Sequence, residues 1–331
     1  MNNTKMFMEN QYKIIHQSSI VVDLHNDYME ERVNHPEHRL FANSKHHTDV
    51  ARLKEGGVNV QFFVVWTRPD EYENHFARAI ELIDILNNDI EECNSEIQLV
   101  KSYSDILSTV DKGKIAAVLC LEGGQLVGNN IDNINKLYEC GMRYLTLAWN
   151  YGTEWCGGAN DDENKGLTQF GKQVIDRLNE LGVMIDVSHV NKKSLDDVLN
   201  YTDKTVIATH SGAYAVNNSK RNLHDEHIKE IARRGGVAGS VFYPYFLNNT
   251  DKATIDDVMK HINYIRNLTG NVDCIALGSD FDGIDITPVG LENVSKFPNL
   301  TKALFDSGYS ADEIRKILGT NALRVFKNIC G

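Results

Sequence analysis

The sequence lacks several features that would assign it to other classes of protein. No stretch approaches the roughly 18 consecutive apolar residues of a membrane-spanning helix, and the opening MNNTKMFMENQYKIIHQ lacks the apolar core of a secretory signal. The closing VFKNICG carries no hydrophobic anchor tail. Six cysteines in 331 residues show no CxxC or zinc-knuckle spacing, and we interpret them most simply as reduced thiols. We therefore expect a cytoplasmic protein without a membrane partner.

Positive charge is also scarce. The 34 lysines and arginines are outnumbered by 46 aspartates and glutamates, so the formal net charge is −12. This balance argues against nucleic acid or an anionic membrane surface as a partner. No Pro- or Gly-rich linker and no internal repeat divides the chain, and its hydrophobic content of 42% can supply a large core. We predict one domain over residues 1–331.

Apolar strand-like runs alternate with amphipathic helical patterns along the chain. The predicted strands are 19–25, 58–66, 114–122, 143–149, 183–189, 205–210, 237–243 and 274–280. Helical spacing is found at 75–92, 167–182 and 254–270, and helices are expected to end at Gly141, Gly182 and Gly270. No Gly-rich phosphate loop follows the first strand, which disfavours a dinucleotide-binding fold. Eight units favour an α/β fold closed into a single (β/α)8 TIM-like barrel, extended by C-terminal helices at 298–310 and 310–329.

Several predicted strands end in side chains that can bind a metal ion. They are His25, Asp27, Glu122, His189 and His210. Charged and imidazole groups at strand ends are typical of a barrel enzyme, whose strands deliver catalytic groups to one rim. Taken alone, a helix cap or a salt bridge would explain Glu122, and a satisfied core position would explain His189 or His210. Together, five such residues predict a metal centre.

The residues next to these candidates allow further expectations. His25 and Asp27 are two positions apart, so they point to one side of a strand and Asn26 should face the other way in a structural role. Ser188 and Ser211 lie beside the two later histidines and are expected to orient their rings. The remaining histidines, at 35, 38, 46, 47, 75, 224, 227 and 261, are interpreted as surface or packing residues.

Five ligands are too many for one tetrahedral zinc ion. They suit two ions about 3.5 to 4 Å apart with one bridging carboxylate, which would generate hydroxide near neutral pH and polarise a carbonyl. A proton handler is then needed, and Asp280 in LGSDFDG, at the end of the last predicted strand, is the candidate. We expect it opposite the first strand across the barrel, with Asp282 and Asp285 as rivals.

Longer motifs point to a family. HND, LEGG, IDVSH, THSGAY followed by KRN, and GSDFDG occur in this order and resemble the membrane dipeptidase (renal dipeptidase) family of the amidohydrolase superfamily. The likeness covers nearly the whole chain, including DVARLKEGGVNVQFF at 49–63 and LGTNALRVF at 318–326. It implies a TIM-like barrel with a binuclear zinc centre that hydrolyses dipeptides, including some with a C-terminal D-residue.

The resemblance also implies roles for individual residues. His25 and Asp27 would hold one zinc ion, His189 and His210 the other, and Glu122 would bridge them. Asp280 would take a proton from the bridging water and pass it to the leaving amine. Arg221 matches the arginine that binds the substrate's C-terminal carboxylate, a role suited to the guanidinium fork, with Lys220 as its competitor. Tyr243 is expected to assist there.

One position departs from the family pattern. Its best-known members carry a His in an LTH sequence after the fourth strand, where it contacts the substrate carbonyl and the tetrahedral intermediate, whereas this chain has Leu147-Ala148-Trp149. Trp149 can donate one hydrogen bond but can neither carry charge nor accept. We expect it to change catalytic rate or substrate range and to leave metal binding intact.

Two other functions stay open. A different amidohydrolase, such as an N-acyl-D-amino acid deacylase or a lactonase, would keep the metals, although Arg221 favours a substrate that ends in a carboxylate. A non-catalytic metal-binding protein would have no use for Asp280 as a proton shuttle. For the oligomeric state, a homodimer is one option.

Overall fold

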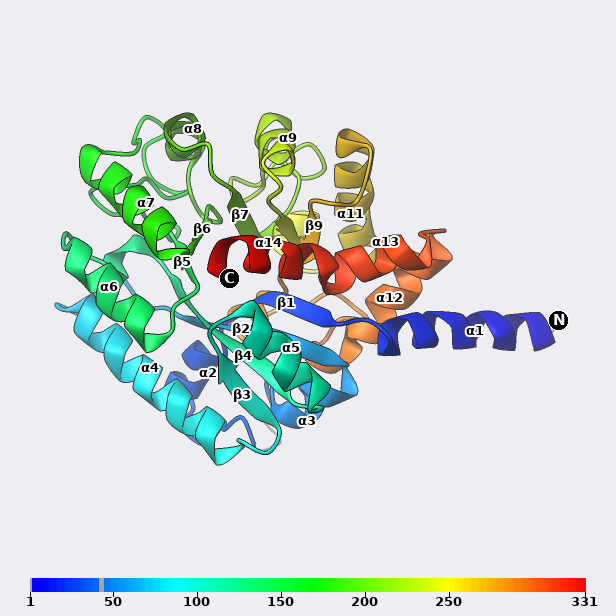
Figure 1. The fold of residues 1–331 in the computed structure, drawn as a ribbon. Coiled ribbons are helices and arrows are strands. Elements are labelled where there is room, and N and C mark those ends of the chain that lie inside the picture. Colours follow the sequence, from blue (N-terminus) through cyan, green and yellow to red (C-terminus); the bar gives the residue numbers. More distant parts are fainter. Residues whose placement is uncertain (1, 42–44) are drawn as a thin grey trace.

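The computed structural model describes residues 2–41 and 45–331, and within them eight parallel strands form a nearly closed barrel (Figure 1). In barrel order the strands are β1 (Val21–Asn26), β2 (Val58–Val65), β4 (Ile115–Glu122), β5 (Tyr144–Thr146), β6 (Met184–Asp186), β7 (Val206–Ser211), β8 (Ala238–Ser240) and β9 (Ile275–Leu277). Two backbone hydrogen bonds join the ends of this series: Asp280 N donates to His25 O at 3.1 Å, and Asp27 N donates to Phe281 O at 2.9 Å. The predicted barrel is confirmed.

The strand prediction needs two corrections. Strand β3 (Ile97–Val100) was not predicted; it pairs only with β4, outside the barrel, and its four residues are too few for a clear pattern. Strands β5, β6, β8 and β9 are shorter than predicted, because the chain leaves the ladder early to form the rim loops. His189 and Asp280 therefore lie three residues beyond β6 and β9 rather than at the ends of strands.

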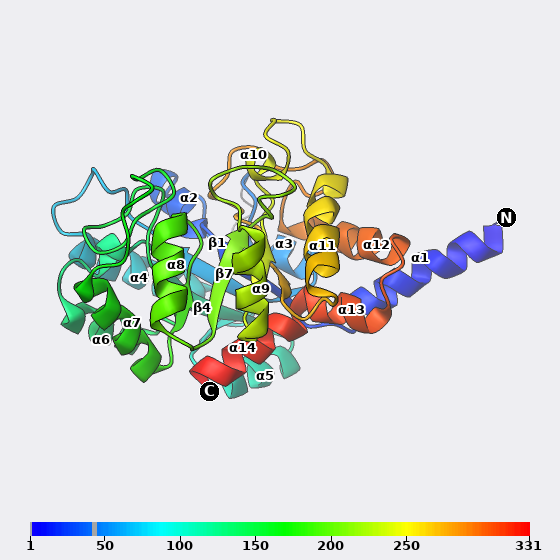
Figure 2. The same ribbon diagram turned by 90° about the horizontal axis from the view of Figure 1, so that it is seen from above.

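Helices surround the sheet, as Figures 1 and 2 show. Their bounds are α1 Asn2–Gln17, α2 Tyr28–Asn34, α3 Val50–Glu55, α4 His75–Glu92, α5 Tyr103–Asp111, α6 Ile131–Cys140, α7 Gln169–Leu181, α8 Lys192–Tyr201, α9 Asp225–Arg233, α10 Pro244–Leu247, α11 Ile255–Thr269, α12 Phe297–Asp306, α13 Ala311–Arg315 and α14 Asn321–Cys330. The helices predicted at 75–92, 167–182 and 254–270 are present within two residues. Gly182 and Gly270 end α7 and α11 in the left-handed conformation, while Gly141 ends α6 at φ 122°, outside it.

The C-terminal extension closes the end of the barrel opposite the rim loops. The predicted pair consists of α12, then α13 and α14 joined by a π-helical turn at Lys316–Thr320. In α14, Phe326 packs edge-on against Phe62 of β2 with ring centres 6.0 Å apart, within the cluster that fills the barrel interior. Figure 2 shows α14 at one end of the barrel and α10 at the other. None of the helices in the described ranges is long and apolar enough to cross a membrane.

Candidate metal centre

The rim at the carboxyl ends of the strands encloses a cavity of about 570 Å³. Six of the residues singled out from the sequence line it: Asp27, Glu122, Trp149, His189, Tyr243 and Asp280. Glu122 is the last residue of β4, and Asp27 follows β1 directly. The alternation of strands and helices thus brings residues about 250 positions apart in the chain to one cavity, as the barrel prediction required.

Three candidate ligands converge on a carboxylate oxygen of a fourth, Glu122. Oε1 of Glu122 lies 3.0 Å from Nε2 of His189, 3.5 Å from Nε2 of His210 and 3.6 Å from Nε2 of His25. Asp27 completes the cluster, because its Oδ2 lies 3.4 Å from Nε2 of His25. Two overlapping groups can each hold an ion, Glu122 with His189 and His210, and Glu122 with His25 and Asp27.

Two buried atoms in this cluster have no hydrogen-bond partner among the described residues, Nε2 of His25 and Oε1 of Glu122. A buried polar atom without a partner is costly, so such an atom in a folded protein calls for an explanation. Imidazole nitrogens and carboxylate oxygens are the ligands that zinc takes in catalytic sites. The donor set therefore fits a pair of divalent ions that share Glu122.

The electrostatics of the cluster are compatible with cation binding. Burial alone would lower the pKa of His25, but the carboxylates of Asp27 and Glu122 outweigh it and raise that pKa to about 10. Burial would raise the pKa of Glu122, whereas the imidazoles of His189 and His25 lower it to about 2. Burial lowers the pKa of His189 to about 4 and holds that of His210 well below its ordinary value. The carboxylate of Glu122 thus faces two neutral imidazoles, His189 and His210, the form that binds metals, whereas His25 would have to give up a proton to bind an ion.

Backbone geometry at the rim is unusual at two of the candidate residues. His189 and Asp280 both have φ 65°, in the left-handed region that residues other than glycine seldom adopt. Gly283 leaves room for the centre, because a Cβ there would lie 2.3 Å from Oδ2 of Asp27. The positive φ angles and the close approach of Gly283 to Asp27 both depend on how the rim loops fold, so they could not be predicted from the sequence.

The imidazoles are oriented by residues that the sequence reasoning missed. Nδ1 of His25 lies 2.9 Å from the hydroxyl of Tyr144, Nδ1 of His189 lies 2.9 Å from Oδ1 of Asn150, and Nδ1 of His210 lies 2.9 Å from Oγ1 of Thr209. Each contact leaves Nε2 for the cluster, the usual outer arrangement of a metal-binding histidine. Buried Asp186 accepts from Thr209 at 2.8 Å. A charged residue within the apolar run VMIDV is unusual, so Asp186 could have been singled out from the sequence.

The serines do not orient the rings, so that expectation is wrong. Ser188 accepts from the backbone N–H of His210 at 3.1 Å, and Oγ of Ser211 is buried without a partner among the described residues. The rings of His25 and His189 are instead contacted by side chains distant in the chain, Tyr144 and Asn150, and the ring of His210 by Thr209, the residue before it. Asn26 has the structural role expected of it: its amide donates to Thr48 at 2.7 Å and its oxygen accepts from Tyr28 N at 3.0 Å.

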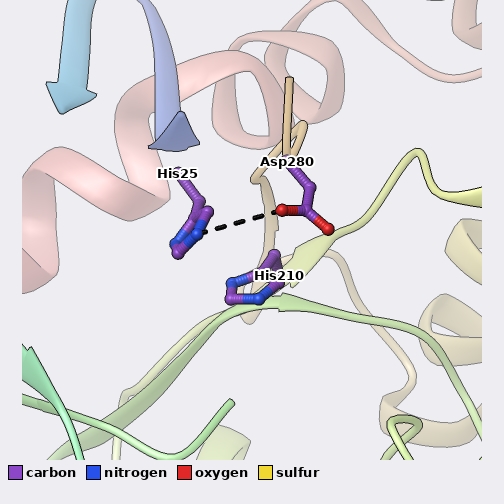
Figure 3. Close-up of side chains that lie close together, drawn as sticks. All are labelled: His25, His210 and Asp280. Carbon is purple, nitrogen blue, oxygen red and sulfur yellow. Dashed lines mark ion pairs between the residues drawn. The ribbon is translucent and has the colours of Figure 1, made fainter. Parts of the chain in front are cut away.

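Asp280 lies beside the first strand and not across the barrel from it. Because the last and first strands of a closed barrel are neighbours, Oδ1 of Asp280 is only 3.9 Å from Nε2 of His25, as Figure 3 shows. Burial, and next the charge of Asp27, raise the pKa of Asp280 well above its ordinary value. Its rivals are placed elsewhere: Oδ1 of Asp282 accepts from His47 N at 2.8 Å, and Asp285 is exposed.

Arg221 and its neighbour Lys220 lie in different environments. Arg221 is buried, donates from Nη2 to His210 O at 3.3 Å, and has an Nε without a partner among the described residues. Its guanidinium carbon lies 5.1 Å from the ring centre of Phe246, which lines the cavity, although Arg221 is not itself part of the wall. Lys220 is exposed and borders a different pocket.

An aromatic wall lines the cavity near His189. The indole of Trp149 stacks at 6.2 Å and 28° on the His189 ring and lies 4.8 Å from the indole of Trp66. Trp66 follows β2 and was not singled out from the sequence. Tyr243, which precedes α10, is half-buried in the wall beside Phe246, with ring centres 4.8 Å apart.

Comparison with known proteins adds the following. The family model for membrane dipeptidase (peptidase family M19) matches residues 9–330. The crystal structure of dipeptidase AC, a metallo peptidase, is 26% identical with a TM-score of 0.88, covering 95% of this chain and 99% of that one. A metallo peptidase from Rhodobacter sphaeroides, liganded with a phosphinate mimic of L-Ala-D-Ala, is 25% identical with a TM-score of 0.87, covering 94% and 100%. An amidohydrolase from Pseudomonas aeruginosa, 24% identical with a TM-score of 0.85 and coverage of 97% and 99%, shares the fold.

Proposed function

The chain belongs to the membrane dipeptidase family, a family of metal-dependent hydrolases, and on that premise we propose that it cleaves dipeptides with two zinc ions bound at the rim cavity. The ion-binding residues in this proposal are His25 and Asp27 for one ion, His189 and His210 for the other, and Glu122 as the bridge. The observation that carries it is the approach of three imidazole Nε2 atoms to one Glu122 oxygen, at 3.0, 3.5 and 3.6 Å.

A zinc pair supplies Lewis acidity and lowers the pKa of water, so that hydroxide forms near neutral pH. The chain's own residues hold the ions and handle the proton. Asp280 faces the cavity beside His25, within reach of a water held in the cluster. We assign it the transfer of a proton from the attacking water to the leaving amine, since its raised pKa suits a group that both accepts and donates.

The two ends of a dipeptide carry opposite charges. Acidic side chains line the cavity, and Arg221 packs against Phe246 of its wall. We assign the terminal carboxylate to Arg221, whose Nε needs a partner, and an assisting role to Tyr243, which packs on the same Phe246. The acidic side chains of Glu30, Asp70 and Glu71 line the same cavity. Arg68, also in the lining, pairs with Glu30 at 2.9 Å and Glu71 at 3.6 Å, so the four side chains together keep a net negative charge that suits a free α-ammonium group. An N-acyl amino acid has no such group, so these acids favour dipeptides over the deacylase alternative.

The substrate class extends to dipeptides with a C-terminal D-residue. Support comes from the Rhodobacter sphaeroides relative, whose bound ligand mimics L-Ala-D-Ala. We also propose a cytoplasmic location, supported by six free cysteines, four of them buried. A homodimer stays a prediction, which light scattering would test.

A substrate panel tests the proposal directly. Purified protein loaded with zinc is assayed against L,L and L,D dipeptides and against their N-acetyl analogues. Cleavage of dipeptides with little or no cleavage of the N-acetyl compounds is expected. Faster cleavage of the N-acetyl compounds would favour a deacylase, and zinc-independent hydrolysis in excess chelator would contradict the metal mechanism.

A further inference from the structure

A second group of imidazoles and carboxylates lies outside the cavity, in the segment that follows β1. It consists of Glu31, His35, Glu37, His38 and His46, none of which lines the cavity. The ring centres of His38 and His46 are 4.2 Å apart, and His35 lies 4.8 and 5.2 Å from them. Three imidazoles this close repel one another when protonated, whereas neutral rings together with the carboxylates of Glu31 and Glu37 form a set of donors for a cation.

The local sequence explains how the group forms. Glu31 and His35 are four residues apart, at the last turn and the C-cap of α2, so they lie on one face of the helix. His38 follows in a turn, and its backbone N–H donates to His35 O at 2.8 Å. His46 comes from the returning chain, next to His47, whose backbone N–H donates to Asp282 at 2.8 Å. Two separate segments therefore meet at Glu31.

The spacing of the donor atoms suits one small ion. Oε2 of Glu31 lies 2.8 Å from Nδ1 of His46 and 3.3 Å from Nδ1 of His38, and one ligand atom each from Glu31, His35 and His46 lie within 4.8 Å of one another. Ligand atoms about 2.1 Å from a tetrahedral zinc ion are about 3.4 Å apart. His38 forms an overlapping group with His35 and Glu37, so its ring would turn to join the other three ligands. The side chains of Glu31 and His38 are 18% and 14% exposed and that of His35 46%, which leaves an open route for the ion.

We propose that this group is a third metal site, in which Glu31, His35, His38 and His46 bind one zinc ion, with Glu37 at its exposed edge. Three nitrogens and one carboxylate oxygen complete a tetrahedral zinc site without an open position, which is the pattern of a structural ion. The sequence interpretation of these three histidines as surface or packing residues is the alternative that the ion count below tests.

The ion would hold two segments of the cavity rim together. Helix α2 begins directly after Asp27, and Glu30, the neighbour of Glu31, lines the cavity and pairs with Arg68 at 2.9 Å. An ion that ties Glu31 to His46 joins α2 to the chain that returns toward α3. We therefore assign it a structural role at the rim, separate from the chemistry at Glu122.

The test compares ion binding in four full-length proteins: wild type, the double variant His35→Gln/His46→Gln, the control His224→Gln, and Glu122→Ala. His224 is a partly buried histidine that stacks on Tyr214, away from both clusters. Metal-free protein is titrated with zinc and its ions are counted by elemental analysis, while dipeptide hydrolysis is followed in parallel. We expect about three ions for wild type and His224→Gln and one fewer for the double variant, which keeps its hydrolytic rate.

Glu122→Ala provides the reciprocal result, because it should lose ions at the cavity and hydrolysis but keep the ion at the rim. Added zinc should still raise its melting temperature, and this rise should disappear when His35→Gln/His46→Gln is added to it. The single variant His35→Gln changes an exposed side chain and should weaken the third ion by about tenfold or more. If the double variant binds as many ions as tightly as wild type, the third site does not exist, whatever the outcome of the dipeptide panel.

Discussion

The hydroxyl of Tyr144 lies 2.9 Å from Nδ1 of His25 and donates to the carbonyl oxygen of Leu24 at 3.2 Å. Because its hydrogen is used at Leu24, the phenol oxygen accepts from Nδ1–H of His25. The ring is thereby held with Nε2 toward Glu122, at 3.6 Å. A residue of β5 thus orients a candidate metal ligand on β1, across the barrel interior.

The first prediction concerns this contact. Tyr144→Phe should weaken zinc binding at the cavity by about 10- to 100-fold, the usual cost of losing an outer partner of a metal-binding histidine. Competition with a chelator measures the affinity. Tyr201→Phe, which removes an exposed phenol bonded to Asp176, is the control and should leave zinc affinity unchanged. Equal affinities for the two variants would show that Tyr144 does not orient His25.

The second prediction concerns the bridging carboxylate. Glu122→Ala should remove at least one of the two cavity ions and essentially all hydrolysis, because both ion-binding groups include Glu122. Elemental analysis and a dipeptide assay check the two effects, with the exposed Glu163→Ala as the control. A Glu122→Ala protein with its full set of cavity ions and wild-type turnover would refute the bridge.

The third prediction concerns the proton handler. Asp280→Asn should keep both cavity ions and lower turnover by roughly 10² to 10⁴, the scale of general acid–base assistance, because an amide cannot shuttle the proton. Asp285→Asn changes the exposed rival and should have little effect. If Asp280→Asn loses an ion instead, Asp280 is a ligand. That outcome has a structural basis, since His25, His210 and Asp280 also form a group that could hold an ion.

The fold was predictable because strand ends carry a strong signal. At Glu122 and His210 an apolar run stops at a charged or imidazole group. Such a pattern indicates a strand and also shows which of its residues lies at the rim. Strand β3 escaped because its four residues, Ile97–Val100, give no clear period. The predicted position of Asp280 was wrong, because closure of the barrel makes the first and last strands neighbours. The linear order of the strands in the sequence does not show this relation.

The orienting residues could not be predicted from the sequence. Tyr144 lies 119 positions from His25, and the two meet only after four strands, β1, β2, β4 and β5, have been placed around the barrel. Asn150 reaches His189 from a loop whose path no periodic pattern describes. The φ of 65° at His189 likewise depends on the folded loop. Candidate ligands were thus found by residue type and position, whereas their orientation required coordinates.

The fourth prediction concerns recognition of the substrate's C-terminal carboxylate. Arg221→Ala should raise KM for dipeptides more than it lowers kcat, because a bidentate contact to a group remote from the scissile bond acts on binding. The wild type should cleave a dipeptide far better than its C-terminal amide, and the variant should lose that difference. Lys220→Ala, next in the chain but exposed, is the matched control. Equal cleavage of acid and amide by the wild type would contradict this role.

The last prediction concerns Trp149, which stands where the best-known family members carry a histidine. Its indole lines the cavity and stacks on His189 at 6.2 Å, so it is placed to contact a bound substrate. A neutral indole cannot direct a positive charge at a developing oxyanion, and loss of one such donor costs about 10² to 10³ in rate. The indole also fills space beside Trp66, which would favour substrates with small side chains.

Trp149→His, assayed on a panel of dipeptides with small and bulky side chains, separates these two effects. A gain in kcat on every substrate is expected if the missing donor limits the rate, because an imidazolium adds charge at the oxyanion. A gain confined to bulky substrates would instead show that the indole acts by restricting the cavity. Trp149→Phe removes the indole N–H and keeps an aromatic ring, so it should leave the size preference largely intact and lower kcat only if that N–H contacts the substrate. Indistinguishable activities for all three proteins on every substrate would show that Trp149 takes no part in recognition or catalysis.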